Sequence, residues 1–460
     1  MQAHGPRVHK VAFLFAFALL TLTLSIPSLA QTPLTLPQAV SIALEKNPLR
    51  KAALADQKAA SAGIKEARSV LLPKIVFSES ATRGNDPVYA FGTRLRQGRF
   101  TADDFELNRL NYPTPIGDFT TRFSGQWTLF DSFANLLTVR RAQKMQEAAT
   151  RQLERADQEA VFRVIDAYCG LLLSMKQEQL ADQELKTAQS ILEDSHNRFQ
   201  SGLVVESDYL SSQVNSASRQ QQLIQSRNAV AFARAKLNNA LGVPVDSPYA
   251  PLDALSEKVF PAPALDESEK RALEARPDLK RVLSEEAAQA DGVKLAKAAF
   301  GPRVNAFGSW QLDNPTFVAG GGSSNWVVGA ELQLDLFSGG GKMARLSREK
   351  ALQEKAAAFR QAYTDGVRLD VRRAFYDHDA ARQTLEVTRA SVAQAEESFR
   401  INQNRYNGGL TTITDLLRAE DATRKVRTDY WESVYRYQIT FANLELATGT
   451  LNSQSPVVMQ

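Results

Sequence analysis

Very few side chains in this sequence have the type and spacing that catalysis or metal binding requires. The 460 residues include one cysteine, Cys169, and only two histidines beyond the first ten positions, His196 and His378. A single thiol excludes an internal disulfide, and neither histidine belongs to a ligand-spaced cluster such as HExxH. The sequence therefore predicts no catalytic residue, no metal site and no cofactor. We expect Cys169 to pack among apolar helix residues and His378 to be solvated.

Phosphate and nucleic-acid binding are also disfavoured. Gly339, Gly340 and Gly341 precede Lys342, but the earlier glycine of a phosphate-binding loop is missing, and Met343 stands where that loop needs serine or threonine. We interpret this segment as a flexible turn between a strand and a helix. The 55 Lys and Arg against 51 Asp and Glu leave a formal charge of +4, too balanced for a dedicated nucleic-acid-binding protein.

The first thirty residues have the pattern of an export signal. A basic start with Arg7 and Lys10 precedes an apolar run over 11–24, and Ser28 and Ala30 are small residues suited to signal peptidase. A transmembrane anchor is the alternative, but ~14 apolar residues fall short of the ~20 that span a bilayer. We predict a cleaved signal peptide over 1–30. No later stretch is apolar enough for a transmembrane helix, so a chain that crosses a membrane must do so as a β-barrel.

The rest of the sequence is an internal duplication. The segment 198–204 recurs as 405–411, and 237–242 matches 444–449 at the same spacing. The predicted domains are a first repeat over 31–257 and a second repeat over 258–460. The first repeat carries about 22 extra residues between 82 and 122, and their Gly, Pro, Asn and Asp content predicts a loop.

Each repeat predicts the order helix, strand, loop, strand, long helix, turn, helix. The long helices, 131–200 and 341–406, contain no proline and have apolar residues three and four positions apart. About 70 residues at ~1.5 Å each give a rod on the order of 100 Å, which needs support from coiled-coil packing. Shorter helices, placed end to end in pairs, have the combined length to line each rod: 38–72 with 203–241, and 266–300 with 410–448.

Four predicted strands alternate apolar and polar side chains: 74–82, 122–130, 303–312 and 326–336. Alternating segments of about ten residues with aromatic residues near their ends are typical of outer-membrane barrels, and a half-buried soluble sheet is the alternative. Four strands cannot close a membrane barrel, which needs ~8. Because open strand edges are not tolerated in lipid, strands that span a membrane would have to be pooled by several chains.

Taken together, these features resemble the TolC-type outer-membrane channel family, the outer membrane factors of drug efflux and type I secretion. The more specific pieces are the helix-to-strand prolines, the strand ends and the two reversal turns: Leu72-Pro73, Gly301-Pro302, Leu129-Phe130-Asp131, Leu336-Phe337-Ser338, Phe199-Gln200-Ser201-Gly202-Leu203 and Tyr406-Asn407-Gly408-Gly409-Leu410. The match covers essentially the whole chain after the export signal.

This resemblance implies an α+β membrane protein that forms a homotrimer in the Gram-negative outer membrane. Four strands from each chain would make a 12-stranded β-barrel, continued through the periplasm by a long antiparallel α-helical coiled-coil barrel. The implied function is a passive exit duct of a tripartite efflux or type I secretion system, for small molecules or polypeptides. The implied partners are outer-membrane lipid, a periplasmic adaptor (membrane fusion) protein and an inner-membrane pump of RND or ABC type.

The reversal turns carry the candidate functional residues. Gly202 and Gly409 supply the left-handed backbone that ends a long helix. Asp208 and Asp415 then fall in the first turns of the returning helices, where an acid suits the helix dipole. Simple capping and a functional role for these two acids both remain open on the residues alone.

The resemblance assigns roles to these turns. It implies adaptor contacts at Gly202, Leu203, Val204, Gly409, Leu410 and Thr411. It also implies that Asp415 lines a closed periplasmic constriction and that Asp208 contacts Tyr406 to hold the tip shut. Arg418 stands where the best-known member has a second constriction acid, and Thr411 stands where it has an arginine that grips the tip. These departures leave the charge of the constriction and the strength of its closure open.

A periplasmic coiled-coil scaffold or adaptor without a pore is the alternative function. An adaptor would need a lipoyl-like or β-barrel module between its helices, and four separated strands do not provide one. Nothing in the sequence identifies the exported substrate.

Overall fold

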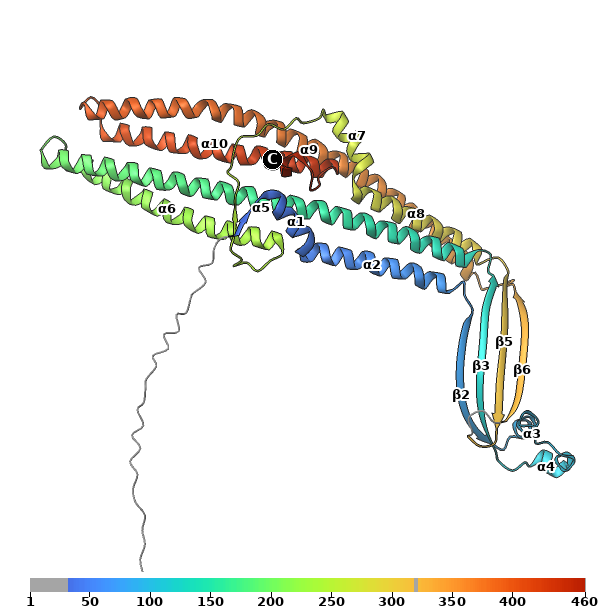
Figure 1. The fold of residues 1–460 in the computed structure, drawn as a ribbon. Coiled ribbons are helices and arrows are strands. Elements are labelled where there is room, and N and C mark those ends of the chain that lie inside the picture. Colours follow the sequence, from blue (N-terminus) through green and yellow to red (C-terminus); the bar gives the residue numbers. More distant parts are fainter. Residues whose placement is uncertain (1–31, 318–321, 460) are drawn as a thin grey trace, which may run out of the picture.

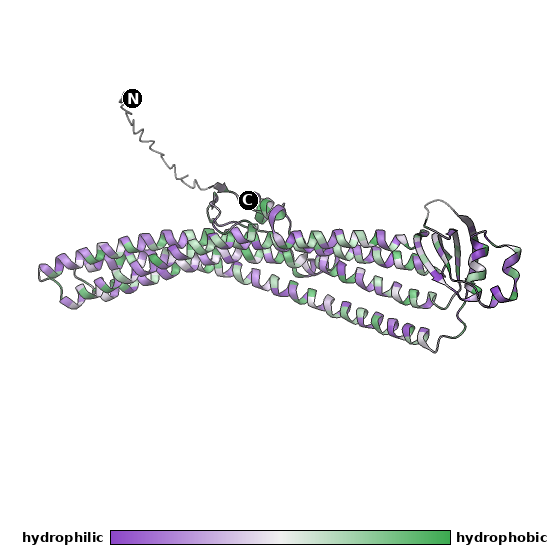
Figure 2. Cartoon of the chain, turned by 90° about the horizontal axis from the view of Figure 1, so that it is seen from below, coloured by the Kyte–Doolittle hydropathy of each residue, from purple (hydrophilic) through white to green (hydrophobic). Residues whose placement is uncertain are grey.

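The computed structural model describes residues 32–317 and 322–459, which form a long helical rod joined at one end to a four-stranded sheet (Figure 1). The predicted signal peptide, 1–30, lies outside the described residues. Hydrophilic and hydrophobic residues mix along every rod helix in Figure 2. Among the residues that the structure describes, no helix combines the length and apolarity needed to cross a membrane.

Two helices of 67 residues each run the length of the rod, α5 (Ala134–Gln200) and α9 (Gly341–Asn407). The shorter helices are α1 (Leu36–Lys46), α2 (Pro48–Ser69), α6 (Glu206–Leu241), α7 (Leu265–Ala275), α8 (Pro277–Ala298), α10 (Ile413–Thr448) and α11 (Pro456–Met459). Helix α5 packs against α2 and α6, and α9 packs against α8 and α10 (Figure 1). The expected end-to-end lining of each long helix is therefore confirmed.

The predicted continuous helices over 38–72 and 266–300 are wrong, because each is broken in two. Asn47 ends α1 and Arg276 ends α7 with extended ψ angles of 125° and 120°, and a proline follows each residue. Proline disfavours the helical conformation of the residue before it and brings no N–H group of its own, so the helix stops and restarts at these points.

The main core forms a belt at mid-rod, where α1, α5, α6 and α10 meet. Tyr168, Ile165 and Leu171 of α5 are fully buried there. A small parallel sheet of β1 (Thr32–Leu34) and β4 (Tyr249–Pro251), which the sequence did not predict, completes this belt together with α11. Cys169 is buried in the same core, as expected.

His378 is buried instead of solvated, so that expectation is wrong. It is 3% exposed, and its ring stacks on Tyr437 with 4.9 Å between centroids. Its Nδ1 atom lies 3.2 Å from the Thr440 hydroxyl of α10. Burial lowers the pKa of His378, which favours the neutral imidazole. The charged neighbours along α9 concealed that His378 occupies the stripe facing α10.

The large sheet is antiparallel in the order β2-β3-β5-β6. Its strands are β2 (Lys74–Gly84), β3 (Ile116–Phe130), β5 (Arg303–Asn314) and β6 (Ser323–Gln333). The register places Phe123 opposite Trp310, and Trp310 opposite Trp326. The expected alternation follows, with aromatic and aliphatic side chains on one face and polar side chains on the other.

Every strand differs from its predicted bounds: β2 and β5 each end two residues later, β6 starts and ends three residues earlier, and β3 starts six residues earlier. Strand β6 ends at Gln333 because its partner there, Arg303, is the first residue of β5, so 334–336 have no strand beside them. Strand β3 begins at Ile116, which pairs with Gly84, well before the predicted start at 122.

The expected loop between β2 and β3 contains helices instead, α3 (Pro87–Arg96), the 3₁₀ turn η1 (Ala102–Phe105) and α4 (Leu107–Asn111). The Asp86 side chain accepts a hydrogen bond from Tyr89 N, and Pro87 occupies the first turn of α3. Aspartate and proline therefore start a helix here, whereas the composition of the segment alone had suggested a loop.

At mid-rod, the glycines that end α6 and α10 press against the helix breaks. Gly242 has φ +75°, and a Cβ atom there would lie 2.7 Å from Asn47 Cα; Gly449 has φ +75° and would meet Arg276 Cα at 2.8 Å. Only glycine combines this left-handed backbone with so close an approach. We call this contact between a helix-ending glycine and a helix break a joint. One joint occurs in each half of the chain.

We expect Gly242→Ala to lower the free energy of unfolding by about 2–3 kcal/mol, since it adds a strained φ and an overlap with backbone. Gly63→Ala, in the middle of α2 with no atom within 4 Å of the new Cβ, is the matched control. It should leave the protein unchanged or about 0.5–1 kcal/mol more stable. Denaturant unfolding of the purified protein measures the stability of both variants. Equal stabilities of the two variants would show that the contact at Gly242 is not needed.

Candidate functional site

The end of the rod farthest from the sheet carries both reversal turns (Figure 1). Gly202 and Gly409 have φ +72° and +68°, as predicted for left-handed helix ends. The backbone N–H groups of Leu203 and Leu410 donate to the carbonyl oxygens of Arg198 and Arg405, both at 2.8 Å. This pattern satisfies the last carbonyls of each long helix. It also leaves the Leu203 and Leu410 side chains 74% and 72% exposed at the very tip.

Asp415 closes the first turn of α10. Its carboxylate accepts hydrogen bonds from the hydroxyls of Thr411 (3.0 Å) and Thr412 (2.9 Å), while Asp415 N donates to Thr412 Oγ1 at 3.2 Å. Both hydroxyl bonds lower the pKa of Asp415. Arg418 is exposed one turn further on, with its Nη1 atom 3.8 Å from Asp415 Oδ1. The structure thus brings Thr411, Asp415 and Arg418 together, and Thr412 is the N-cap of α10, with Asp415 as its partner in the capping contact.

Tyr406 occupies the core of the tip. It is 4% exposed in a cluster with Ile191, Ile413 and Leu416. Burial raises the pKa of its hydroxyl, and the Ser195 side chain opposes that effect. Asp208 is close enough to act on this pKa through its charge, but no hydrogen bond joins Tyr406 to Asp208 in the described chain.

Arg198 joins the α5–α6 hairpin to the α9–α10 hairpin at the tip. The sequence did not reveal this role. Its guanidinium lies 5.0 Å from the centroid of the Tyr406 ring. Its Nη atoms donate to the carbonyl oxygens of Tyr406 and Asn407, each at 3.4 Å, while Nε binds Asp194 at 2.8 Å. The available signal was its position in the last turn of α5, where an arginine can reach carbonyl groups beyond its own helix.

A buried charged cluster lies further along the rod from the tip. Arg219 of α6 pairs with Asp421 and approaches Glu420, both on α10, and Asn215 Nδ2 donates to Glu420 Oε2 at 2.9 Å. Burial raises the pKa of Glu420 and of Glu184 on α5. Like Arg198, this cluster ties the α5–α6 hairpin to the α9–α10 hairpin. It depends on contacts between distant segments and has no signature in the sequence.

The class of the protein follows from comparison with known families. Residues 39–243 and 270–450 match the family described as outer membrane efflux protein, and the chain belongs to this family. Its members are channels of the Gram-negative outer membrane and not enzymes. The chain is thus an outer-membrane exit duct, and this result favours the duct over the scaffold.

Individual relatives agree with this class. The chain is 24% identical over 423 residues to alkaline protease secretion protein AprF of Pseudomonas aeruginosa, covering 89% of this chain and 83% of that protein. It is 23% identical over 457 residues to proteases secretion protein PrtF of Dickeya chrysanthemi, covering 95% and 92%.

Solved structures show the same fold. The CmeC outer membrane channel of Campylobacter jejuni matches with a TM-score of 0.76 at 20% identity, over 92% of this chain and 87% of that one. A membrane protein from Pseudomonas aeruginosa matches with a TM-score of 0.79 at 20% identity, over 90% and 93%.

The cap at Asp415 predicts a pH dependence confined to the start of α10. The pKa of this carboxyl is lowered from 3.8, so its stabilising effect is complete above that value and is lost as the pH falls through the lower, folded value. Hydrogen exchange of the first amides of α10 should therefore accelerate at pH 3 relative to pH 6, after correction for the intrinsic rate. Asp415→Ala should show fast exchange at both pH values.

Asp429→Ala is the matched control, because this carboxylate lies on the same helix and pairs only loosely with Lys425, at 3.8 Å. It should leave exchange at the start of α10 as in the unmodified chain. Exchange that is insensitive to both pH and Asp415→Ala would show that the cap does not hold this turn.

Proposed function

We propose that three copies of this chain form one duct, with a closed 12-stranded barrel in the outer membrane and a helical tunnel through the periplasm. The observation that carries the proposal is the sheet. Its apolar face exposes Trp326, Val328 and Leu332 by 73%, 70% and 68%. Its edge strands, β2 and β6, have no further strand beside them in the described chain. Pairing β6 of one copy with β2 of the next would remove every edge and turn the apolar face to lipid.

The proposed duct is built from two repeats, 31–257 and 258–460. Support comes from matched elements: one rod helix, one returning helix, one broken helix and two long strands in each half. Three copies of a duplicated chain would present six similar hairpins around the tunnel. We propose that this quasi-symmetry lets partners engage each copy at two related positions.

We propose that the tip is the docking point for a periplasmic adaptor. Leu203 and Leu410 are exposed apolar side chains at the very end of the rod, one on each reversal turn. Together with Gly202, Val204 and Gly409 they form two small, similar surfaces that a helical hairpin of an adaptor could contact. Such adaptors in turn link the duct to an inner-membrane pump.

The names of the relatives favour polypeptides as cargo. AprF and PrtF are described as proteins of protease secretion. We propose type I secretion with an ABC-type pump as the first function. Small-molecule efflux with an RND-type pump is the second, which is favoured by 24% identity to the pyoverdine export protein OpmQ of Pseudomonas putida.

We propose that Asp415 and Arg418 line the periplasmic constriction. Three Asp415 carboxylates near the axis would attract cations. Arg418, only 3.8 Å away, would reduce this field. The expected duct therefore has a weak cation preference.

We propose that Tyr406, Asp208 and Arg198 hold the tip closed. Arg198 holds the end of α9 through its carbonyl oxygens and the ring of Tyr406, while Asp208 contributes charge nearby. Thr411 supports the Asp415 cap in place of an arginine grip. Opening would require these contacts between the two hairpins to separate.

Single-channel recording in planar bilayers tests the duct. The unmodified protein should form a stable pore of low conductance, and Asp415→Ala should lower its preference for K⁺ over Cl⁻ by about twofold. Asp246→Ala, in the exposed turn after α6, removes the same charge at mid-rod and should change nothing. A folded oligomer without conductance would overturn the duct, whereas a pore indifferent to Asp415→Ala would remove this residue from the constriction.

Arg198→Ala should raise the conductance and the frequency of opening, because it releases α9 from α5 at the tip. Arg198→Lys should have a smaller effect, since lysine keeps the charge near Tyr406 but cannot bridge two carbonyl groups and Asp194 at once. Arg405→Ala is the matched control: this arginine occupies the equivalent place on the other hairpin. Equal conductance of Arg198→Ala and Arg405→Ala would show that Arg198 does not close the tip.

A further inference from the structure

The connection between β2 and β3 is much longer than the sheet requires. Gly84 and Ile116 are paired partners at the end of the two strands, and a two-residue turn could join them. Residues 85–115, here called the insert, stand in that place and carry α3, η1 and α4. In the second half of the chain, the connection between β5 and β6 runs only from 315 to 322.

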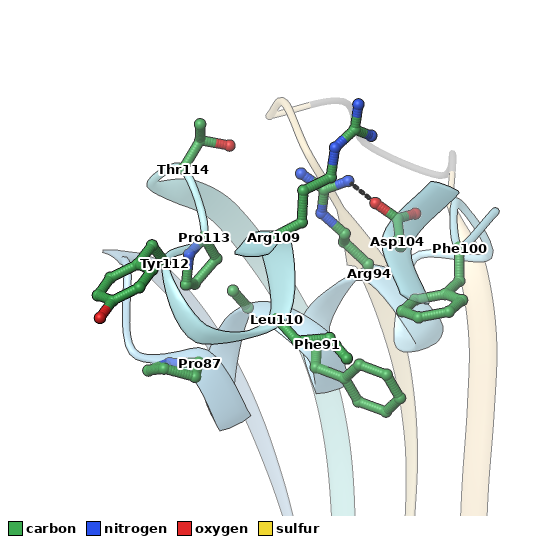
Figure 3. Close-up of a pocket in the computed structure, with 11 residues that line it drawn as sticks. Pro87, Phe91, Arg94, Phe100, Asp104, Arg109, Leu110, Tyr112, Pro113 and Thr114 are labelled. Carbon is green, nitrogen blue, oxygen red and sulfur yellow. Dashed lines mark hydrogen bonds and ion pairs between the residues drawn. The ribbon is translucent and has the colours of Figure 1, made fainter. Parts of the chain in front are cut away.

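The insert is a folded unit with its own small core. The Phe100 ring contacts Phe91 at 4.7 Å and Phe105 at 5.2 Å between centroids. Arg94 forms an ion pair with Asp104 (Figure 3). The Asp104 carboxylate also accepts a hydrogen bond from Thr101 N at 2.9 Å. Phe91, Phe100 and the Arg94–Asp104 pair border a cavity of about 280 Å³ between α3, η1 and α4. A segment with these internal contacts keeps a fixed shape.

The insert is anchored on the polar face of the sheet. Gln97 Nε2 donates to Gly117 O and Asp118 Oδ1, both at 2.9 Å. Arg96 Nε lies 3.8 Å from Asp313 Oδ1, and Asn325 Nδ2 donates both to Arg96 O (3.2 Å) and to Asp313 Oδ2 (2.8 Å). Asp118 and Asp313 are only 3% and 1% exposed beneath it. Buried acids with these partners make the attachment specific.

The alternation of the strands identifies this face. Asp118 lies on the same side of β3 as Gln126, and Asp313 lies on the same side of β5 as Gln311, whereas Trp310 lies on the other side. In the proposed barrel, the face opposite the tryptophans lines the lumen. Helix α3 contacts both β3 and β6, so the insert crosses from its origin beside β2 toward the far edge of its own sheet. In the proposed barrel, α3 would therefore lie over the lumen side at the strand ends away from the rod, and Figure 1 shows α3 and α4 extending beyond those ends.

The insert also exposes apolar side chains that nothing in the described chain covers. Phe105, Leu107 and Tyr112 are 65%, 78% and 81% exposed. Lipid cannot reach the lumen side of a closed barrel. In the proposed trimer, each neighbouring copy would bring its own insert to this height, with the same apolar side chains.

We propose that the inserts of three copies meet through these apolar side chains across the outer mouth, where they cap the duct at the end opposite the periplasmic tip. This inference rests on the proposed trimeric barrel. The contact is between identical segments and would give the duct a second barrier, independent of the closure at Arg198 and Tyr406.

Thiol labelling from outside intact cells tests whether the inserts cap the outer mouth. Gln126→Cys places a thiol on the proposed lumen face of β3, and a bulky polymer-linked maleimide reports access through the mouth. The native Cys169 can stay, because it is buried and burial raises its pKa to about 12. We expect labelling to be at least about tenfold faster in two variants: one with 85–115 replaced by Asn-Gly, and one with Phe105→Ser, Leu107→Ser and Tyr112→Ser.

Two controls accompany these variants. Asn108→Ser with Asn111→Ser changes exposed polar residues of the same segment and should leave labelling slow. Arg99→Cys, on the exposed surface of the insert, should label quickly and shows that the reagent reaches the cell surface.

The outcomes distinguish a failure of the proposed cap at the outer mouth from a failure of the proposed duct. Each variant is first checked for conductance, and absence of conductance in all of them would overturn the proposed function itself. If the variants conduct and Gln126→Cys labels equally fast with and without the insert, the insert does not cap the mouth. If only the Asn-Gly variant labels quickly, the insert obstructs the lumen without the apolar contact between copies, and the proposed interface is wrong.

Discussion

The architecture depends on the joint at which two short helices meet end to end beside a long one. A helix of 67 residues buries only a narrow stripe, so it needs a partner along its whole length. The chain supplies that partner in two pieces and fixes their junction by pressing Gly242 against Asn47, and Gly449 against Arg276. The belt of buried side chains holds the first joint to α5. At the second joint, Gln158 of α5 donates a hydrogen bond to Gly449 O at 2.7 Å, and a smaller apolar cluster packs on α9. With the joints in place, the reversal turns and the sheet are set at opposite ends of one rod.

Features that depend only on residues close together in the sequence could be predicted. The long helices, the alternating strands and the left-handed glycines at 202 and 409 each follow from a periodicity or a backbone requirement that a few neighbouring residues express. The breaks before Pro48 and Pro277 were missed because the strong helical pattern on either side outweighed one proline. The extra length of the insert was predicted, but its helices were missed because Asp86 and Pro87 suit a helix start as well as a loop.

Features that depend on distant contacts could not be predicted. His378 has charged neighbours along the chain, and only the packing of α9 on α10 places it against Tyr437. Arg198 binds carbonyl groups more than two hundred positions away. At the tip, the resemblance supplied the candidate residues, whereas the geometry joined Thr411 to Asp415 and Tyr406 to Arg198.

The joints also set the mechanical leverage of the rod. Each returning helix, α6 or α10, spans 36 residues between a joint and the tip, or about 54 Å. A tilt of about 5° at the joint would displace the tip sideways by about 5 Å, comparable to the width of a side chain. Because α5 and α9 pass the joints unbroken, such a tilt must be absorbed as gentle curvature over several turns. In the proposed duct, a small elastic deformation at mid-rod would thereby be converted into a larger sideways movement of the tip.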